Sequence, residues 1–560
     1  MADGKLILDY VYEHEARQPE RVYMTQPIGG GAVVDYTWGQ TLDQARRMAA
    51  HLKSLNLPAG ARIAILSKNC AHFIMAELAI WMAGGTTVAI FPTETAETVR
   101  FVLEHSEASL LFVGKLDTWP QQQPGVSASL PCIALPLAPP TSFDTWDAII
   151  ARTEPLGGRP QRAPLDLALI TYTSGSTGQP KGVMQCFERI TAATELSVDY
   201  VKQLVPNGGK EHRLLSYLPL AHVYERAVVE CNSLVDGNTH IFFAESLDTF
   251  IQDLNRARPT IFCSVPRLWL KFQQGVFAKM PPKKLDRLLA LPLIGNLVRH
   301  KVLKGLGLDQ VQIAMSASAP IPAELIAWYR KIGLKLLEGY GMTEDFAYSH
   351  SSNEKQRAAG YVGVPLPGVQ AKLSEEGEIL IKSPGQMLGY YKRPDLDADC
   401  FTADGFFRTG DKGEWREDGL LKLTGRVKEL FKTAKGKYVA PAPVENRLNA
   451  NPLVEIALVS GVGQVAAFAL VVLAEDVRPK VKDAAVRAQV EAEMAQLLKD
   501  VNAELPDYER LGMLVLSTEP WTIENGCLTP TMKIKRNRIE EMVAARVEGW
   551  YAKGKSVQWA

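Results

Sequence analysis

A loop of small, hydroxyl-bearing residues carries the strongest chemical signal in the sequence. It follows the apolar run LALITY and consists of Thr173, Ser174, Gly175, Ser176, Thr177, Gly178, Gln179, Pro180, Lys181 and Gly182. Glycines let the backbone approach a ligand closely, and backbone N–H groups, hydroxyls and the Lys181 ammonium all suit phosphate oxygens. The Walker A pattern does not fit this loop. The loop therefore predicts phosphate binding, with a flexible surface loop as the alternative.

Three further motifs could do chemistry, although each is weak when taken alone. EGYGMTE (338–344) offers an aromatic ring that could stack on a base and a carboxylate, Glu344, that could ligate Mg²⁺. Asp411 and Arg426 fall at strand ends, where they could hold ribose hydroxyls. TPTMKIKR (529–536) places lysines near the end of a loop. The plainer alternatives are a turn with a core tyrosine, isolated surface charges and a solvated basic patch.

The first half of the chain contains the elements that must position these motifs. Apolar residues from Leu42 to Leu55 recur at the spacing of one helix face, and ARIAIL follows as a short buried strand. The stretch from Phe73 to Phe91 predicts a buried helix, a Gly-Gly turn and a strand. LLFV (110–113) predicts another strand. Strands that alternate with helices indicate parallel sheets covered by helices.

The pattern of predicted helices and strands changes later in the chain. The Pro-rich stretch from about 120 to 164 predicts a surface connection, after which LALITYT opens a second α/β layer at Leu167. From about 360, short strands separated by turns predict a small antiparallel unit. The last part predicts two strands, a long helix from Asp483 to about Glu504 and a final strand-and-loop region. The G-x-G-x-x-A pattern at 461–466 lies between two strands, so it predicts a hairpin turn and not a dinucleotide site.

Composition narrows the class of protein. The chain has 560 residues, with 62 basic and 62 acidic side chains, so it has no overall attraction to nucleic acid and we expect no such partner. Its seven cysteines are scattered, without the spacing of a zinc or redox site. The N-terminus has no signal-peptide pattern, so we expect a cytoplasmic protein. The stretch from Phe73 to Phe91 is too interrupted to span a bilayer.

Taken together and in this order, the motifs resemble the adenylate-forming, or AMP-binding, superfamily of acyl-CoA synthetases, nonribosomal adenylation domains and luciferases. The resemblance runs from about Tyr36 to Arg536. It implies an α/β fold with a large N-terminal domain of two α/β layers plus a small β-barrel-like unit, followed by a small mobile α+β C-terminal domain. The large domain would span 1–427, with subdomains at about 1–160, 165–355 and 356–427. The small domain would span 428–560, with a hinge near Lys428.

The resemblance also implies a role for each motif. The loop from Thr173 to Lys181 would hold the β- and γ-phosphates of ATP. Thr343 would contact the α-phosphate, Glu344 would bind Mg²⁺, and Asp411, with Arg426 beside it, would hold the ribose. Lys533 would bridge the carboxylate and ATP, although Met532 stands where the family usually has glycine. The adenine side of the site would consist of Ser318, Ala319, Glu338, Gly339, Tyr340, Gly341 and Met342.

The segment LPLAHVYER (218–226) looks most like the long-chain fatty acyl-CoA synthetase branch. There the histidine, here His222, lies near the reacting carboxylate; a purely structural histidine is the alternative. The segment lacks the aspartate with which amino-acid-activating relatives pair the substrate amine. The resemblance therefore implies an AMP-forming acid–thiol ligase. It would convert a medium- to long-chain fatty acid to acyl-AMP and then to acyl-CoA, releasing pyrophosphate and AMP.

Some questions stay open at this point. Lys435 and Gly436 could contact phosphates of coenzyme A, the co-substrate, or form a plain solvated turn. The acyl group could instead pass to an acyl-carrier protein in trans, or the chain could be a non-catalytic nucleotide-binding protein. Basic residues between Lys279 and Lys304 surround apolar LLALPLIGNLV. This segment predicts a core helix, with peripheral contact at the inner face of a membrane as the alternative.

Overall fold

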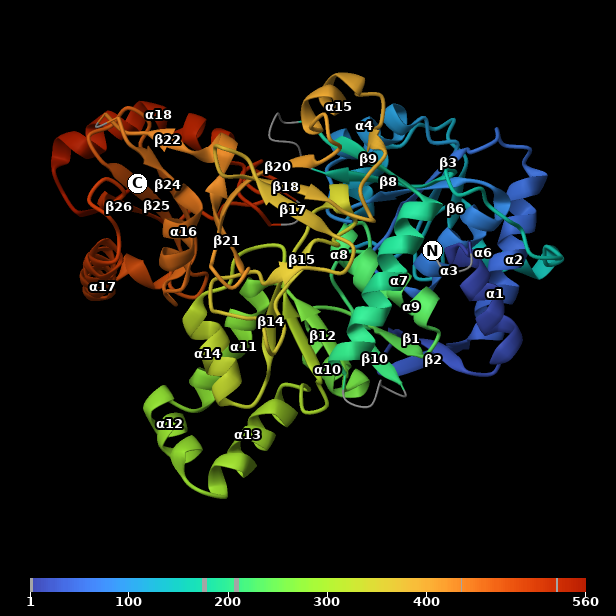
Figure 1. Cartoon of the computed structure of the whole chain (residues 1–560), viewed down its shortest axis with the longest axis horizontal. Coiled ribbons are helices and arrows are strands. Elements are labelled where there is room, and N and C mark those ends of the chain that lie inside the picture. The colour runs from blue at the N-terminus through green and yellow to red at the C-terminus, as the bar shows by residue number, and fades with distance from the viewer. Residues whose placement is uncertain (1–3, 174–178, 206–210, 435, 530–531) are drawn as a thin grey trace.

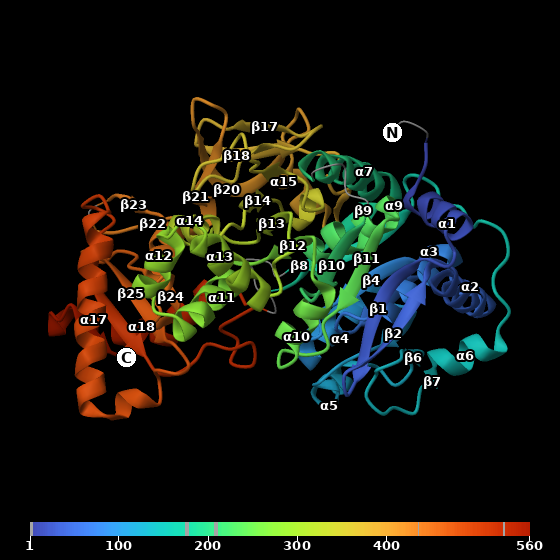
Figure 2. The same cartoon turned by 90° about the horizontal axis from the view of Figure 1, so that it is seen from below.

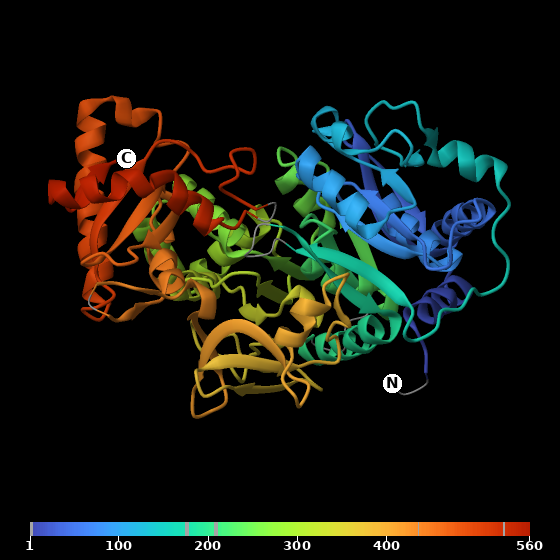
Figure 3. The same ribbon diagram turned by 90° about the horizontal axis from the view of Figure 1, so that it is seen from above.

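The computed structural model describes residues 4–173, 179–205, 211–434, 436–529 and 532–560. A large body, running from blue to light orange in Figure 1, adjoins a smaller C-terminal unit in deeper orange and red. Figures 2 and 3 show that this unit lies at the opposite end of the molecule from the N-terminal helices. The predicted mixed α/β fold, with a large first domain and a small last one, is confirmed.

An eight-stranded sheet forms the centre of the body, in the order β19-β9-β8-β4-β3-β5-β6-β7. The strands from β8 to β7 are parallel, whereas β9 and β19 are antiparallel to their neighbours. The strands are β3 (Arg62–Leu66), β4 (Thr86–Ile90), β5 (Leu110–Val113), β6 (Cys132–Ala134), β7 (Asp144–Thr145), β8 (Leu167–Thr173), β9 (Lys181–Cys186) and β19 (Gly389–Tyr390). Helices of this region are α1 (Ile7–Arg17), α2 (Trp38–Ser54), α3 (Ala71–Ala83), α4 (Ala96–Ser106), α5 (Trp119–Gln122), α6 (Trp146–Arg152) and α7 (Phe187–Leu204).

This sheet corrects two predictions. LALITYT does not open a second layer, because β8 pairs with β4 inside the first sheet. The Pro-rich stretch is more than a surface connection, since it supplies β6, β7 and α6 and buries Trp146 completely. Its strands have only two or three residues, too few for a periodic pattern to show in the sequence.

Two further sheets complete the α/β part of the body. One has the order β10-β11-β1-β2 and the other β12-β13-β14-β15-β16. The first contains β1 (Val22–Gly29), β2 (Ala32–Thr37), β10 (His212–Ser216) and β11 (Thr239–Phe243). The second contains β12 (Ile261–Ser264), β13 (Ile313–Ser316), β14 (Leu336–Tyr340), β15 (His350–Ser351) and β16 (Val364–Pro365). Helices here are α8 (Val223–Glu225), α9 (Asn232–Asp236), α10 (Phe250–Ala257), α11 (Pro266–Lys279), α12 (Pro282–Ala290), α13 (Ile294–Gly305) and α14 (Ala323–Lys331).

The predicted antiparallel unit is a four-stranded sheet in the order β17-β18-β20-β21. Its strands are β17 (Gln370–Leu373), β18 (Glu378–Lys382), β20 (Phe407–Trp415) and β21 (Leu421–Arg426), and α15 (Pro394–Cys400) lies between β19 and β20 in the chain. Asp411 on β20 pairs in register with Arg426 on β21. The sheet thereby brings two of the candidate site residues together.

The C-terminal unit has a four-stranded sheet with buried apolar side chains on both faces. The G-x-G-x-x-A pattern joins two antiparallel strands, as predicted, and the long helix begins at its N-cap Asp483. The predicted final loop region is wrong, because it contains the 18-residue α18, whose buried residues are only Ile539, Val543 and Trp550. Elements here are β22 (Phe431–Lys432), β23 (Tyr438–Val439), α16 (Pro441–Asn449), β24 (Val454–Ser460), β25 (Ala467–Leu473), α17 (Ala484–Ala503), β26 (Leu511–Ser517), α18 (Arg536–Lys553) and β27 (Val557–Trp559).

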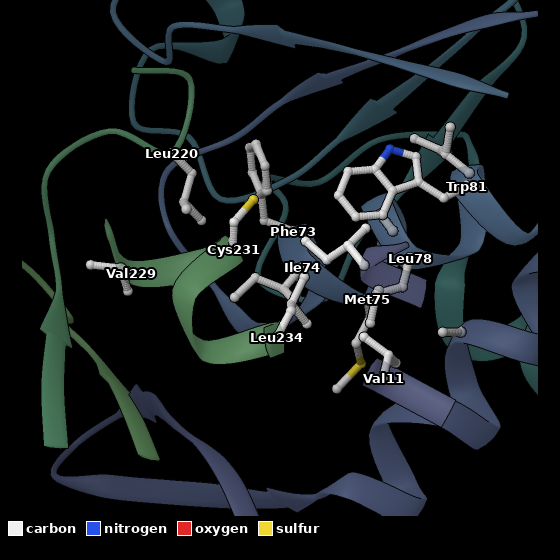
Figure 4. Close-up of a cluster of buried hydrophobic side chains, with 14 of the residues drawn as sticks. Val11, Phe73, Ile74, Met75, Leu78, Trp81, Leu220, Val229, Cys231 and Leu234 are labelled. Carbon is white, nitrogen blue, oxygen red and sulfur yellow. The ribbon is translucent and has the colours of Figure 1, made fainter. Parts of the chain in front are cut away.

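Helix α3 forms the centre of the main core. It is apolar on nearly every side and all but one of its residues are buried, as expected for a helix enclosed by protein. Figure 4 shows Phe73, Ile74 and Trp81 of this helix among side chains from α1 and the region around α9. The Trp81 indole donates to the carbonyl of Ala168, 3.2 Å away, and so joins α3 to β8. In the described part of the chain no helix is long and apolar enough to cross a membrane.

Candidate active site

Three residues from separate motifs form one hydrogen-bonded chain. The Tyr340 hydroxyl, at the end of β14, donates to Asp411 Oδ2 over 2.7 Å. Arg426 Nε donates to the other oxygen of Asp411 over 2.9 Å. The Asp411 charge raises the pKa of Arg426, and burial raises the pKa of the Tyr340 hydroxyl, so Arg426 stays charged and Tyr340 stays protonated. A carboxylate fixed by two hydrogen bonds beside an aromatic ring is suited to hold ribose hydroxyls next to a base.

Glu344 lies beside the end of the predicted phosphate loop. The Tyr390 hydroxyl donates to Glu344 Oε1 over 2.7 Å, and the Lys181 ammonium lies 5.3 Å from the centre of the Tyr390 ring. Tyr390 is absent from the predicted site, and only its place on β19, paired with β9, reveals its position. Ser174, Gly175, Ser176, Thr177 and Gly178 lie outside the described residues. Thr173 and Lys181 flank them as a cross-strand pair.

A Mg²⁺ ion would have one protein carboxylate here. In the described ranges no cluster of three or more histidine, cysteine or acidic side chains could hold a metal. Mg²⁺ in phosphate sites is commonly held by one or two carboxylates together with substrate phosphates. Glu344, which has only one oxygen bonded to Tyr390, fits that mode.

The segment from Glu338 to Glu344 is held rigidly. A Cβ on Gly341 would lie 2.8 Å from the Ala347 backbone, so this close approach requires glycine. Asp345, which the sequence analysis missed, accepts from the Met342 N–H over 2.9 Å, and burial raises its pKa to about 8. Burial also raises the pKa of Glu338 to about 8. Thr343 is buried and Gly339 packs near Met315, so the segment is stiff but leaves Tyr340 and Glu344 half-exposed.

Lys533 reaches this group of residues from the C-terminal unit. Its side chain is exposed, although the protein around it partly desolvates the ammonium. Desolvation and the nearby Arg426 charge lower its pKa, while Asp411 and Glu344 oppose the shift. The Lys533 N–H donates to Thr529 Oγ1 over 3.1 Å and fixes the loop that carries it. The tertiary structure therefore brings Lys533 to residues that precede it by more than a hundred positions.

His222 faces the same region from the body. Its Nδ1 accepts from the Tyr224 N–H over 3.1 Å, so the neutral ring carries its proton on Nε2. Burial, followed by the charge of Lys533, lowers the pKa of His222 to about 3. The ring is therefore a neutral hydrogen-bond donor at physiological pH.

A buried polar network positions the His222 loop. Asn69 donates to the Leu218 carbonyl over 2.7 Å and accepts from the Leu220 N–H over 3.0 Å. Arg226 Nε donates to the Leu220 carbonyl over 3.1 Å, and its guanidinium pairs with Glu77 of α3. Arg226 and Glu77 are both fully buried. The sequence analysis missed this network, although Glu77 in an otherwise apolar helix was the available signal.

The remaining predicted site residues that the structure describes lie in turns of the large body and of the C-terminal unit. Ser318 has a φ of +71° in the turn after β13, and Ala319 is exposed next to it. Gly436 has a φ of +72° in the β22–β23 hairpin, where its N–H donates to the Thr433 carbonyl. Lys435 lies outside the described residues. Lys428 lies in the short turn Val427–Glu429, directly after β21.

Comparisons with known proteins show the family and the fold to which the chain is similar. Residues 11–391 match the AMP-binding enzyme family, and residues 429–555 match the AMP-binding enzyme C-terminal domain. The long-chain-fatty-acid–CoA ligase FadD15 of Mycobacterium bovis is 30% identical, over 97% of this chain and 96% of that protein. The human long-chain-fatty-acid–CoA ligase 1 is 29% identical, over 88% of this chain and 78% of that protein. The adenylation domain of a carboxylate reductase from Mycobacterium chelonae has the same fold, with a TM-score of 0.79 and 23% identity. The match covers 98% of this chain and 92% of that domain.

Met532, beside Lys533, provides a test of how the backbone positions the lysine. Its φ of +62° is left-handed, a conformation that glycine adopts freely and branched side chains strongly disfavour. We expect Met532→Gly to keep wild-type pyrophosphate release. We expect Met532→Val to slow it at least tenfold, because strain of about 1–3 kcal/mol would displace the loop. Equal rates for the valine variant and the wild type would show that this backbone conformation does not position Lys533.

Proposed function

The chain belongs to the AMP-binding enzyme family and activates a carboxylic acid with ATP, and we propose that it is a fatty acid–CoA ligase. Its acid is a medium- to long-chain fatty acid, and its acceptor is coenzyme A. One observation carries the proposed chemistry: Lys533 of the small unit lies among His222, Glu344, Asp411 and Arg426 of the large one. Cations and a neutral donor thus surround the place where two anions must react.

In the first half-reaction an oxygen of the fatty acid carboxylate attacks the α-phosphorus of ATP. The new O–P bond forms as the bond to pyrophosphate breaks, giving acyl-AMP. Both reactants are anionic, so the site must neutralise charge that concentrates in the transition state. Lys533 lies between the two anions, and Thr343 contacts the α-phosphate. Glu344 would hold Mg²⁺, which supplies positive charge to the phosphate oxygens when bound.

The other residues orient the reactants. Asp411 accepts hydrogen bonds from the ribose hydroxyls and is itself held by Tyr340 and Arg426. The Tyr340 ring lies against adenine. His222 donates from Nε2 to the substrate carboxylate, since its Nδ1 is already bonded to the Tyr224 N–H. No side chain acts as a nucleophile, so positioning and electrostatics supply the catalysis.

In the second half-reaction the thiol of coenzyme A attacks the acyl carbonyl, and AMP leaves. The small domain, residues 428–560, turns about Lys428 and takes Lys533 out of the site. The segment with Gly436, in the β22–β23 hairpin, then approaches the coenzyme A phosphates, and Lys435 would contact them as well. The short turn at Val427–Glu429 lies between the last strand of the body and the first of the small unit, as a hinge would.

A substrate panel tests the proposed acid and acceptor. Acids from acetate to oleate, together with aromatic acids, are scored by pyrophosphate release with coenzyme A or an acyl-carrier protein as acceptor. We expect the highest kcat/KM with medium- or long-chain fatty acids and turnover with coenzyme A. A preference for aromatic acids would overturn the proposed substrate. Transfer only to the carrier protein would make the chain a fatty acyl-AMP ligase, and ATP binding without pyrophosphate release on any acid would leave a non-catalytic nucleotide-binding protein.

Lys533→Ala separates the two half-reactions. We expect adenylate formation to fall by at least a thousandfold, because the variant lacks the cation between the reacting anions, while thioester formation from supplied acyl-AMP stays near the wild-type rate. Pyrophosphate release and acyl-CoA formation are measured separately. Lys535→Ala, two residues away on the same loop, is the matched control. An equal loss in both half-reactions would contradict the movement of the small domain.

The pH dependence of adenylation follows from Lys533. Because desolvation and Arg426 lower its pKa, its ammonium loses the proton at a lower pH than a free lysine does. We therefore expect adenylation to fall as the pH rises through that pKa, and thioester formation from acyl-AMP to lack this alkaline limb. Lys533→Arg should remove the limb, since guanidinium stays charged. An alkaline limb unchanged in Lys533→Arg would assign it to another group.

A further inference from the structure

The helical unit α12–α13 exposes an apolar tip ringed by cations. The turn between its helices and the first turn of α13 contain Leu291, Leu293, Ile294 and Leu297, which are all exposed. Leu293 and Leu297 are the most open, at 83% and 71% of their full surface. Sequence analysis favoured a core helix here, and the structure shows that this expectation is wrong for the outer face. Only Gly295 of α13 is buried.

The inner face of the same unit is well anchored. Leu285 and Leu289 of α12 are buried in a cluster with Trp269 of α11 and Trp328 of α14. A Cβ on Gly295 would lie 2.5 Å from the Leu289 carbonyl oxygen, so α12 and α13 approach each other closely. The exposed leucines are therefore not needed to hold the unit in place. Figure 1 shows α12 and α13 projecting beyond α11 and α14 at the lower edge of the molecule.

The charge around the tip is almost all positive. Asp286 is the only acidic residue between 279 and 304, and it is paired with Lys331 over 2.6 Å. Arg299 is engaged by Asn296 and by the Lys331 carbonyl. Among the described residues, the other cations of the unit have no acidic partner. These exposed side chains are Lys279, Lys283, Lys284, Arg287, Lys301 and Lys304.

We propose that the α12–α13 tip docks on an anionic phospholipid bilayer, with its leucines in the acyl–headgroup boundary and its lysines at the headgroups. The tip projects from the body, so it can reach the broad surface of a bilayer. Exposed leucines supply the apolar area that interfacial binding needs, and clustered cations supply attraction to anionic lipid. Leu165, an exposed apolar residue elsewhere, follows Arg162 and directly precedes Asp166, so its sequence neighbours carry both signs of charge.

Vesicle flotation tests the proposal independently of catalysis. The full chain is floated with vesicles of phosphatidylcholine alone and of phosphatidylcholine with phosphatidylglycerol. We expect the wild type to bind the anionic vesicles at least tenfold better, and added salt to weaken that binding because it screens the charges. Leu293→Ser/Leu297→Ser and Lys283→Glu/Lys284→Glu should each reduce binding at least tenfold, while Leu165→Ser should leave it unchanged.

The controls keep folding and activity apart from docking. All four substituted side chains are exposed, so the melting temperature and the adenylation of a short, water-soluble acid should match the wild type in both variants. The proposal is overturned if the wild type does not float, or if both variants float as well as the wild type. A wild type that dimerises through the tip, with dimerisation abolished by Leu293→Ser/Leu297→Ser and no flotation, would instead make it a protein interface.

Discussion

The fully buried ion pair between Arg226 and Glu77 connects the core of the molecule to the candidate active site. Removing two charges from water is unfavourable unless they are paired and hydrogen-bonded. Separating the two side chains would therefore leave a buried, unpaired charge at a high cost in free energy. Glu77 belongs to α3, the helix at the centre of the main core, and Arg226 also holds the Leu220 carbonyl. The position of His222 therefore depends on the packing of a helix about 150 residues earlier in the chain.

The candidate site contains both acidic and basic side chains, and these come from different sheets. β14, β20 and β21 contribute Tyr340, Asp411 and Arg426, while the small unit contributes Lys533. These groups shift one another: Lys533 helps to keep His222 neutral, and Arg426 lowers the pKa of Lys533. If Lys533 moved away, each group would lose the part of its pKa shift that the neighbouring charge causes, while burial would still lower the pKa of His222. In the proposed reaction, this proximity would make adenylation sensitive to the position of the small domain.

Sequence patterns predicted much of the fold, and where they failed the reason is physical. The helix, turn and strand from Phe73 to Phe91 are visible because a buried helix must be apolar all round and Gly84 can adopt the φ of +93° at its end. The short strands β6 and β7 lack enough residues for a period to show. Helix α18 buries so few apolar residues that its helical period cannot be recognised in the sequence. Strand β8 has nothing in its own sequence that selects β4 as its neighbour.

The sequence by itself determined which chemical groups are present: the hydroxyl-rich loop, Glu344, Asp411, Arg426, His222 and Lys533, in an order that identifies the family. It also determined Gly341, where no side chain fits. Only the tertiary structure decided that Tyr390 supports Glu344, that Asn69 and Arg226 hold the His222 loop, and that the leucines of α13 point outward. Local patterns report the preferences of neighbouring residues. Hydrogen bonds and burial between segments far apart in the chain depend on how sheets and helices pack, and no local pattern records that.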